Sequence, residues 1–132
     1  MTGYIGYHKR AVPAPDDELT FLRQVLASDD LVSAVTSSKD VDTAKPQPDI
    51  VQVALDRAGV DATRAVFVGD AVWDVEACER AGVPTIALLS GGVSRGELET
   101  AGAQAVFEDP SDLCAHLDGT AIGTLAKPIQ TA

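Results

Sequence analysis

A short apolar run that ends in a glycine and an aspartate constrains the fold of this chain more than any other feature of its sequence. The run is Ala65-Val66-Phe67-Val68, it is bounded by polar residues, and Gly69-Asp70 follows it directly. Successive apolar residues are typical of a strand buried on both faces, because a half-buried strand would alternate apolar and polar side chains. A helix is predicted to follow at once, from about Trp73 to Ala81. A strand followed directly by a helix is the repeating unit of a parallel sheet covered by helices.

The rest of the chain repeats this alternation of short apolar runs and helical patterns. Further strands are predicted at Leu31–Val35, Thr85–Leu89 and Ala105–Phe107, and further helices at Asp16–Leu26, Asp49–Ala58, Ser94 to near Gly102, and Ser111–Leu117. Ser94 and Glu97 have the spacing of a capping box, and Gly59 stands where a C-terminal cap belongs. We therefore predict the α/β class, as a Rossmann-like parallel sheet with helices on both faces and polar chemistry at the carboxyl ends of its strands.

Length and composition fit one compact domain. The chain has 132 residues, of which 45% are hydrophobic, enough for a single core. We predict that residues 16–118 form the core, that residues 1–15 precede it as a separate segment, and that residues 119–132 follow it as a tail. Both end segments lack a sustained periodicity and are expected to be irregular.

Charge and hydropathy exclude several classes of partner. The formal net charge of −10 disfavours nucleic acids and anionic membrane surfaces, and Lys9-Arg10 is the only basic pair in the sequence. The longest apolar run, Val83–Leu89, is far too short to span a membrane, and no basic stretch followed by an apolar segment opens the chain. Cys78 and Cys114 lack C-x-x-C spacing. We therefore expect a cytoplasmic protein with reduced thiols and with neither nucleic acid nor membrane as a partner.

Two carboxylates follow the buried strand at a spacing that suits a metal ion. Asp70 and Asp74 are four residues apart, so both can face one pocket, and Mg²⁺ is commonly held by one or two protein carboxylates together with water and phosphate oxygens. Alternatively, Asp70 begins a turn and Asp74 stabilises the first turn of the helix. Lys45 stands in an earlier loop that also opens a helix, from which its ammonium group can approach both carboxylates, although a lysine in a loop is ordinarily solvated.

The segments around these three residues resemble motifs of the haloacid dehalogenase (HAD) superfamily of hydrolases. Ala44–Asp49 is similar to the third motif and Val66–Asp74 to the fourth, and the similarity extends from about residue 16 to residue 118. The chain most resembles the phosphoglycolate-phosphatase-like branch, which implies Mg²⁺-dependent hydrolysis of a small phosphorylated metabolite. The resemblance gives Lys45 a catalytic role, steadying nucleophile and phosphate, and makes Asp70 and Asp74 the Mg²⁺-binding residues, with Asp70 the direct ligand.

The first motif of that family has no counterpart in its expected place. It is an apolar strand ending in Asp-x-Asp-x-Thr, whose aspartates act as nucleophile and as general acid and base. Asp40-Val41-Asp42-Thr43 contains an Asp-x-Asp pair, but it follows Ser37-Ser38-Lys39 and shares a loop with Lys45, so we interpret it as a solvated acidic loop. Val12-Pro13-Ala14-Pro15 offers no hydroxyl for the second motif, and no cap segment is present. We therefore expect a truncated domain with an incomplete core.

A missing central strand has a consequence for the sheet. Ala65–Val68 would be left with an unpaired edge, and a bare apolar edge favours self-association. Tyr4-Ile5-Gly6-Tyr7 is the only apolar run near the start of the chain. We predict that it forms a replacement strand that pairs with Ala65–Val68 in place of the missing central strand.

Two functions remain open on these grounds. The first is a HAD-like, phosphatase-type hydrolase that is weak or inactive, because nucleophile and general acid are both missing. The alternative is a non-catalytic module that binds Mg²⁺ or phosphate, or that pairs with another chain through its open sheet edge. A response-regulator receiver is disfavoured because Lys45 precedes Asp70, and a dinucleotide site because Gly91–Gly96 lacks Gly-x-Gly-x-x-Gly spacing.

Overall fold

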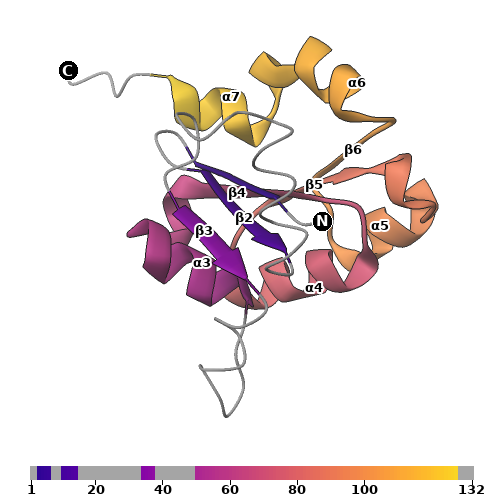
Figure 1. Cartoon of the computed structure of the whole chain (residues 1–132). Coiled ribbons are helices and arrows are strands. Elements are labelled where there is room, and N and C mark those ends of the chain that lie inside the picture. Colours follow the sequence, from indigo (N-terminus) through magenta and orange to yellow (C-terminus); the bar gives the residue numbers. More distant parts are fainter. Residues whose placement is uncertain (1–2, 7–9, 15–33, 38–49, 128–132) are drawn as a thin grey trace.

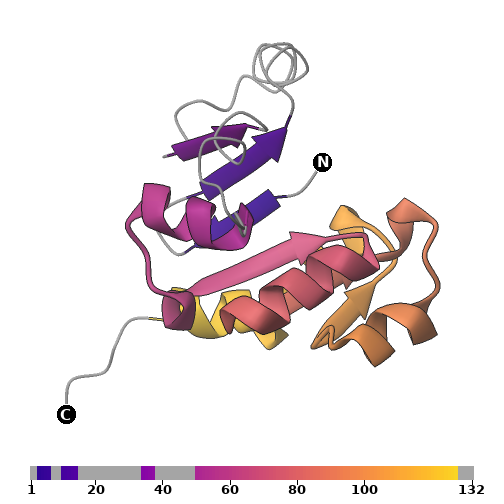
Figure 2. The same ribbon diagram turned by 90° about the horizontal axis from the view of Figure 1, so that it is seen from below.

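The computed structural model describes residues 3–6, 10–14, 34–37 and 50–127, which form a sheet with helices on both of its faces (Figures 1 and 2). The six strands lie in the order β3 (Ala34–Ser37), β2 (Arg10–Ala14), β1 (Gly3–Gly6), β4 (Ala65–Gly69), β5 (Thr85–Leu88) and β6 (Ala105–Phe107). The helices are α3 (Ile50–Ala58), α4 (Val72–Ala81), α5 (Arg95–Ala101), α6 (Pro110–Ala115) and α7 (Ala121–Ala126), with short 3₁₀ turns η1 (Ala62–Arg64), η2 (Leu89–Gly91) and η3 (Leu117–Gly119). The predicted α/β class is confirmed.

Successive residues of β4 enter two different cores, as expected for a strand buried on both faces. Phe67 packs with Val51, Leu55 and Cys78 on the face covered by α3 and α4. Val66, on the opposite face, packs in a second core to which α6 and α7 contribute. A third cluster joins α4 and α5 to β5 and β6 through Val75, Ala87, Leu98 and Val106. Both faces of β4 and β5 are thus covered by helices.

Most of the elements predicted after residue 48 are observed at or close to their predicted bounds. α3, β4, α4, β5 and β6 match within one residue at each end, and Gly59 has the positive φ of 64° that a C-terminal cap requires. The helix predicted at residues 111–117 is observed as α6 followed by η3. The predicted helix at residues 16–26 lies outside the described residues. Of the strand predicted at Leu31–Val35, the structure describes only Ala34 and Val35, which begin β3. None of the described helices is long and apolar enough to cross a membrane.

The first strand corrects the expected edge of the sheet. β1 pairs with β4, with Tyr4 opposite Phe67 and Ile5 opposite Val66, so the expectation that β4 lacks a partner on this side is wrong. The predicted replacement strand is confirmed for residues 4–6, while Tyr7 lies outside the described residues.

The direction of β1 also departs from the expected parallel sheet. It runs antiparallel to both β2 and β4, whereas the pairs β2–β3, β4–β5 and β5–β6 are parallel. Residues 7–9 alone separate β1 from β2, and a connection between parallel neighbours needs about a dozen residues or more. The short connection therefore dictates a hairpin, and β1 enters the sheet reversed.

Both segments that were expected to be irregular contain regular structure. Arg10–Ala14 forms β2, although it contains Pro13, which cannot donate a backbone hydrogen bond and is disfavoured inside a sheet. Ala121–Ala126 forms α7, whose Ile122 and Leu125 pack into the core on the face of β4 that carries Val66. Two large apolar residues on so short a helix give almost no periodicity, so this helix depends on its packing.

The predicted capping box at the start of α5 is confirmed. Ser94 Oγ accepts a hydrogen bond from the backbone N–H of Glu97 at 3.3 Å, and Glu97 Oε2 accepts one from the backbone N–H of Ser94 at 3.2 Å. The Ser94 hydroxyl also donates to Glu97 Oε2 at 2.6 Å. These bonds, chiefly that from the Ser94 side chain, hold the pKa of Glu97 below its ordinary value of 4.5.

Ser94→Ala is expected to lower the melting temperature at pH 7 by about 3–5 °C, the usual effect of losing a helix cap in a domain of this size. A carboxyl whose pKa is lower in the folded chain stabilises the fold above its unfolded pKa of about 4.5 and loses that contribution as the pH falls through the folded pKa. The difference in melting temperature between the unchanged protein and Ser94→Ala should therefore shrink as the pH falls from about 5 to about 3, a range that spans the unfolded pKa of Glu97. Calorimetry at several pH values measures this difference in melting temperature. A difference that grows as the pH falls would contradict the stabilising role of the Ser94–Glu97 capping box.

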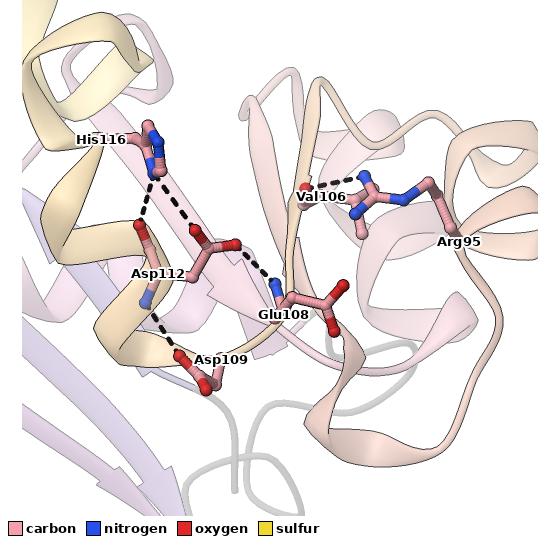
Figure 3. A network of polar contacts seen from close by, with 6 residues as sticks. All are labelled: Arg95, Val106, Glu108, Asp109, Asp112 and His116. Atoms are coloured by element: carbon pink, nitrogen blue, oxygen red, sulfur yellow. Dashed lines mark hydrogen bonds and ion pairs between the residues drawn. The ribbon is translucent and has the colours of Figure 1, made fainter.

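A polar network fixes α6 beside the end of β6 (Figure 3). Asp112 is its centre: its Oδ2 accepts from the backbone N–H of Glu108 at 2.9 Å, and its own backbone N–H donates to Asp109 Oδ1 at 2.8 Å. His116 Nδ1 lies 2.8 Å from the carbonyl oxygen of Asp112 and 3.2 Å from its Oδ1, and the imidazole stacks on Phe107. His116 therefore has a structural role at the end of α6.

An arginine covers part of the outer edge of the sheet. Arg95 Nη1 donates to the carbonyl oxygen of Val106 at 2.8 Å, as Figure 3 shows, and Val106 lies on β6, the last strand in the sheet order. A carbonyl that is already bonded is not available to a foreign strand, which reduces the tendency of this edge to pair.

Candidate functional site

The candidate site lies where β4 ends and α4 begins. β4 ends at Gly69, Asp70 follows it, and α4 starts at Val72. Ala71 is the N-cap of α4, and no side chain caps it, so Asp70 does not serve as the helix cap. Asp70 lies in the bend between β4 and α4, in agreement with the alternative that it begins a turn, and Asp74 lies in the first turn of the helix, where its charge is favourable.

The carboxylate of Asp74 lies over the end of β4. Its Oδ2 is 3.1 Å from the position that a β-carbon on Gly69 would occupy, so the side chain turns back toward the strand. The same β-carbon would lie 2.3 Å from Cε1 of Phe67, which shows how tightly the ring packs beneath Gly69. Asp70 and Asp74 are both half-buried and both lie at this end of β4. Both aspartates that the sequence singled out therefore lie near the carboxyl end of β4.

The turn after the neighbouring strand reaches the same place. β4 and β5 are parallel, so η2, which follows β5, lies at the same edge of the sheet as Asp70. A β-carbon on Gly91 would lie 2.7 Å from the backbone oxygen of Asp70. The sequence alone did not predict this contact. The only available signal was a glycine pair placed directly after a buried strand.

The donor set at this edge fits Mg²⁺. Two aspartate carboxylates supply the anionic oxygens that this cation prefers, and Mg²⁺ is commonly held by one or two protein carboxylates plus water or phosphate oxygens. Within residues 50–127 and the described strands before them, no three His, Cys, Asp or Glu side chains form a cluster that could hold a metal ion alone. A cation held by Asp70 and Asp74 would therefore keep coordination positions for water and for an anionic ligand.

Lys45 lies outside the described residues, as do Asp40–Thr43, so their predicted roles are not tested by the geometry. The elements on either side of them are informative. β2 and β3 run parallel to each other and antiparallel to β1, so they point in the same direction as β4. The carboxyl end of β3 therefore lies at the Asp70 edge of the sheet, and the segment that contains Lys45 begins there.

Neither β1, which pairs with β4, nor β2, which lies on the far side of β1, carries an acidic side chain. β1 is Gly-Tyr-Ile-Gly, and β2 is Arg-Ala-Val-Pro-Ala. Because β1 is antiparallel, Gly3 lies opposite Val68 near the candidate site, and Gly6 lies opposite Ala65 at the other end of β4. β1 therefore ends at the edge of the sheet opposite the candidate site.

Comparison with known families gives a match across the centre of the chain. The family model described as haloacid dehalogenase-like hydrolase matches residues 18–88, a stretch that contains Asp70, Asp74 and Lys45.

Curated relatives are similar over a longer stretch. The phosphoglycolate phosphatase of Rhodospirillum rubrum is 34% identical over 99 residues, which are 75% of this chain and 41% of that protein. The phosphoglycolate phosphatase of Caulobacter vibrioides is also 34% identical, over 71% of this chain and 39% of that protein. The chain thus spans about two fifths of the length of these relatives.

Solved structures share the fold. A hydrolase from Pseudomonas syringae has a TM-score of 0.65 at 34% identity, covering 80% of this chain and 50% of that one. A structure from Thermotoga maritima, assigned as a beta-phosphoglucomutase, has a TM-score of 0.70 at 23% identity, covering 83% of this chain and 52% of that one. The second likeness concerns the fold alone.

Proposed function

Because the chain belongs to the family of haloacid dehalogenase-like hydrolases, we propose that it contains the magnesium- and phosphate-binding half of a phosphatase-type site. Asp70 and Asp74 bind Mg²⁺ through carboxylate oxygens, and Lys45 pairs with the phosphate. The observation that supports this proposal is the position of both aspartates at the carboxyl end of β4, with the Asp74 carboxylate turned back over Gly69. The substrate class is a small phosphate monoester, in keeping with the phosphoglycolate phosphatases that the chain resembles.

The chain's own residues would orient a phosphate rather than attack it. Bound Mg²⁺ polarises a phosphoryl oxygen and neutralises its charge. Asp70 and Asp74 fix the cation at the sheet edge, and the Lys45 ammonium group balances the remaining negative charge of the phosphate. Covalent attack on phosphorus needs a separate nucleophile, and neither β1 nor β2 supplies a carboxylate next to β4. We propose accordingly that these 132 residues by themselves have weak or no hydrolase activity.

A second function is favoured by one observation. β1 occupies the place beside β4 in the reversed direction and carries no acidic residue, which suits a module that binds Mg²⁺ and phosphate without turnover. The two functions share the same metal site and differ in whether a phosphate ester is cleaved.

Two measurements on the full chain test these proposals. We expect a saturable change in Trp73 fluorescence on Mg²⁺ titration, because this indole lies between Asp70 and Asp74 in sequence and is 74% exposed. We expect hydrolysis of 4-nitrophenyl phosphate with Mg²⁺ to stay close to the buffer rate. An absent Mg²⁺ response would refute the metal site. Robust hydrolysis that is lost in Asp70→Asn would show that a nucleophile is present after all and would exclude the non-catalytic module.

A further inference from the structure

The turn after β5 packs directly against the backbone of Asp70. A β-carbon on Gly91 would lie 2.7 Å from both Cβ and the carbonyl oxygen of Asp70, and 2.8 Å from its carboxyl carbon. Ordinary contacts between such non-bonded atoms are about 3.5–4.0 Å. Only glycine therefore allows this approach.

The contact cannot be relieved by a side-chain rotation. Two of the three atoms close to Gly91, the Cβ and the carbonyl oxygen of Asp70, have positions set by the backbone. The backbone before Asp70 is paired in register with β5, with Gly69 opposite Ala87. On the other side of the contact, the N–H of Gly92 donates to the carbonyl oxygen of Leu89 at 3.1 Å, which closes the turn. A methyl group at position 91 would therefore displace either the Asp70 carboxylate or the whole turn.

Gly91 and its neighbour Gly92 are required for different reasons. Gly92 has a φ of 80°, and a β-carbon there would meet no atom within 4 Å. Its requirement is conformational, because side chains disfavour positive φ. Gly91 is required by the space beside Asp70, which is a property of the candidate site.

We propose that Gly91 is a positioning residue for Asp70. Its missing side chain lets η2 pack against the backbone and carboxyl carbon of Asp70, which restricts the carboxylate to the end of β4 where Asp74 also lies. This inference rests on the proposed Mg²⁺ site, and it adds to that site a residue from the turn after β5 that restricts the position of the Asp70 carboxylate. Groups that orient a metal ligand typically contribute about 10- to 100-fold to metal affinity.

A matched pair of glycine substitutions tests the inference in the full chain. Gly91→Ala introduces the methyl group beside Asp70, whereas Gly96→Ala introduces it at an exposed position of α5 with no atom within 4 Å. Both changes remove similar freedom from the unfolded chain, so they differ mainly in the contact. The readouts are the Mg²⁺ dissociation constant from Trp73 fluorescence and the rise in melting temperature on adding Mg²⁺, which reports binding to the folded state.

We expect Gly91→Ala to weaken Mg²⁺ binding by about tenfold, and Gly96→Ala to change it by less than about twofold. Equal affinity in the unchanged protein and in Gly91→Ala would overturn the inference while leaving the metal site intact. No Mg²⁺ response in the unchanged protein would instead refute the proposed function. If Gly91→Ala does not fold, Gly92→Ala loosens the same turn without touching Asp70. Unaltered Mg²⁺ affinity in that variant would also overturn the inference, and a loss of about threefold would support it.

Discussion

Asp70→Asn is expected to abolish the Mg²⁺-induced rise in melting temperature and to weaken Mg²⁺ binding by at least about 100-fold. Asparagine keeps the shape of the side chain but loses the anionic oxygen that a hard cation requires. Changes to groups that merely orient a ligand already cost up to about 100-fold, so loss of a direct ligand should cost more. Titration of Trp73 fluorescence with Mg²⁺, at constant ionic strength, measures the effect.

The control must account for the charge of the whole chain. A formal net charge of −10 attracts cations without any specific site, and this attraction is screened by salt. Asp61→Asn changes the net charge by the same amount at an exposed position that precedes β4, at the opposite end of the strand from Asp70. Asp61→Asn should bind Mg²⁺ like the unchanged chain. Equal losses in the two variants would mean that the cation responds to overall charge, and the assignment of Asp70 would fail.

The elements from α3 to β6 could be predicted from the sequence because local signals define them. β4 is an apolar run with a glycine at its end, and α5 is bounded by the Ser94 capping box and by Gly102, whose φ is 118°. Each signal acts within a few residues, so its effect does not depend on the rest of the fold. The positions of Asp70 and Asp74 followed from the same logic, because a strand that runs directly into a helix places the residues between them and the first turn of the helix near the end of the strand.

The features that were missed depend on contacts between distant segments. The reversed direction of β1 follows from its short connection to β2 and from the slot beside β4, neither of which periodicity reveals. α7 is stabilised by packing on the core and carries little pattern of its own. The approach of Gly91 to Asp70 is set by the register of β4 and β5. Sequence reasoning therefore identified the two candidate aspartates but not the turn that packs against one of them.

Phe67→Ala is expected to destabilise the fold by about 3–5 kcal/mol, the usual cost of truncating a buried phenylalanine. Phe67 is 1% exposed and packs between β4 and the helices α3 and α4. Domains of this kind have a total stability of about 5–15 kcal/mol, so the loss is a large share of it. Urea denaturation followed by far-UV circular dichroism measures the change. Trp73→Ala truncates an aromatic side chain that is 74% exposed and should cost about 0.5 kcal/mol or less.

A double-mutant cycle with Gly69 connects this core residue to the candidate site. Gly69→Ala alone places a β-carbon 2.3 Å from Cε1 of Phe67, so the ring, the strand end or both must shift. In the Phe67→Ala background the ring is absent and the same methyl group has room. The two changes together should therefore destabilise the fold by less than the sum of their separate effects, with a coupling of about 1 kcal/mol or more. Additive effects would show that the ring does not limit the end of β4. Coupling would mean that the packing of Phe67 requires a glycine at the point where the chain presents its two aspartates.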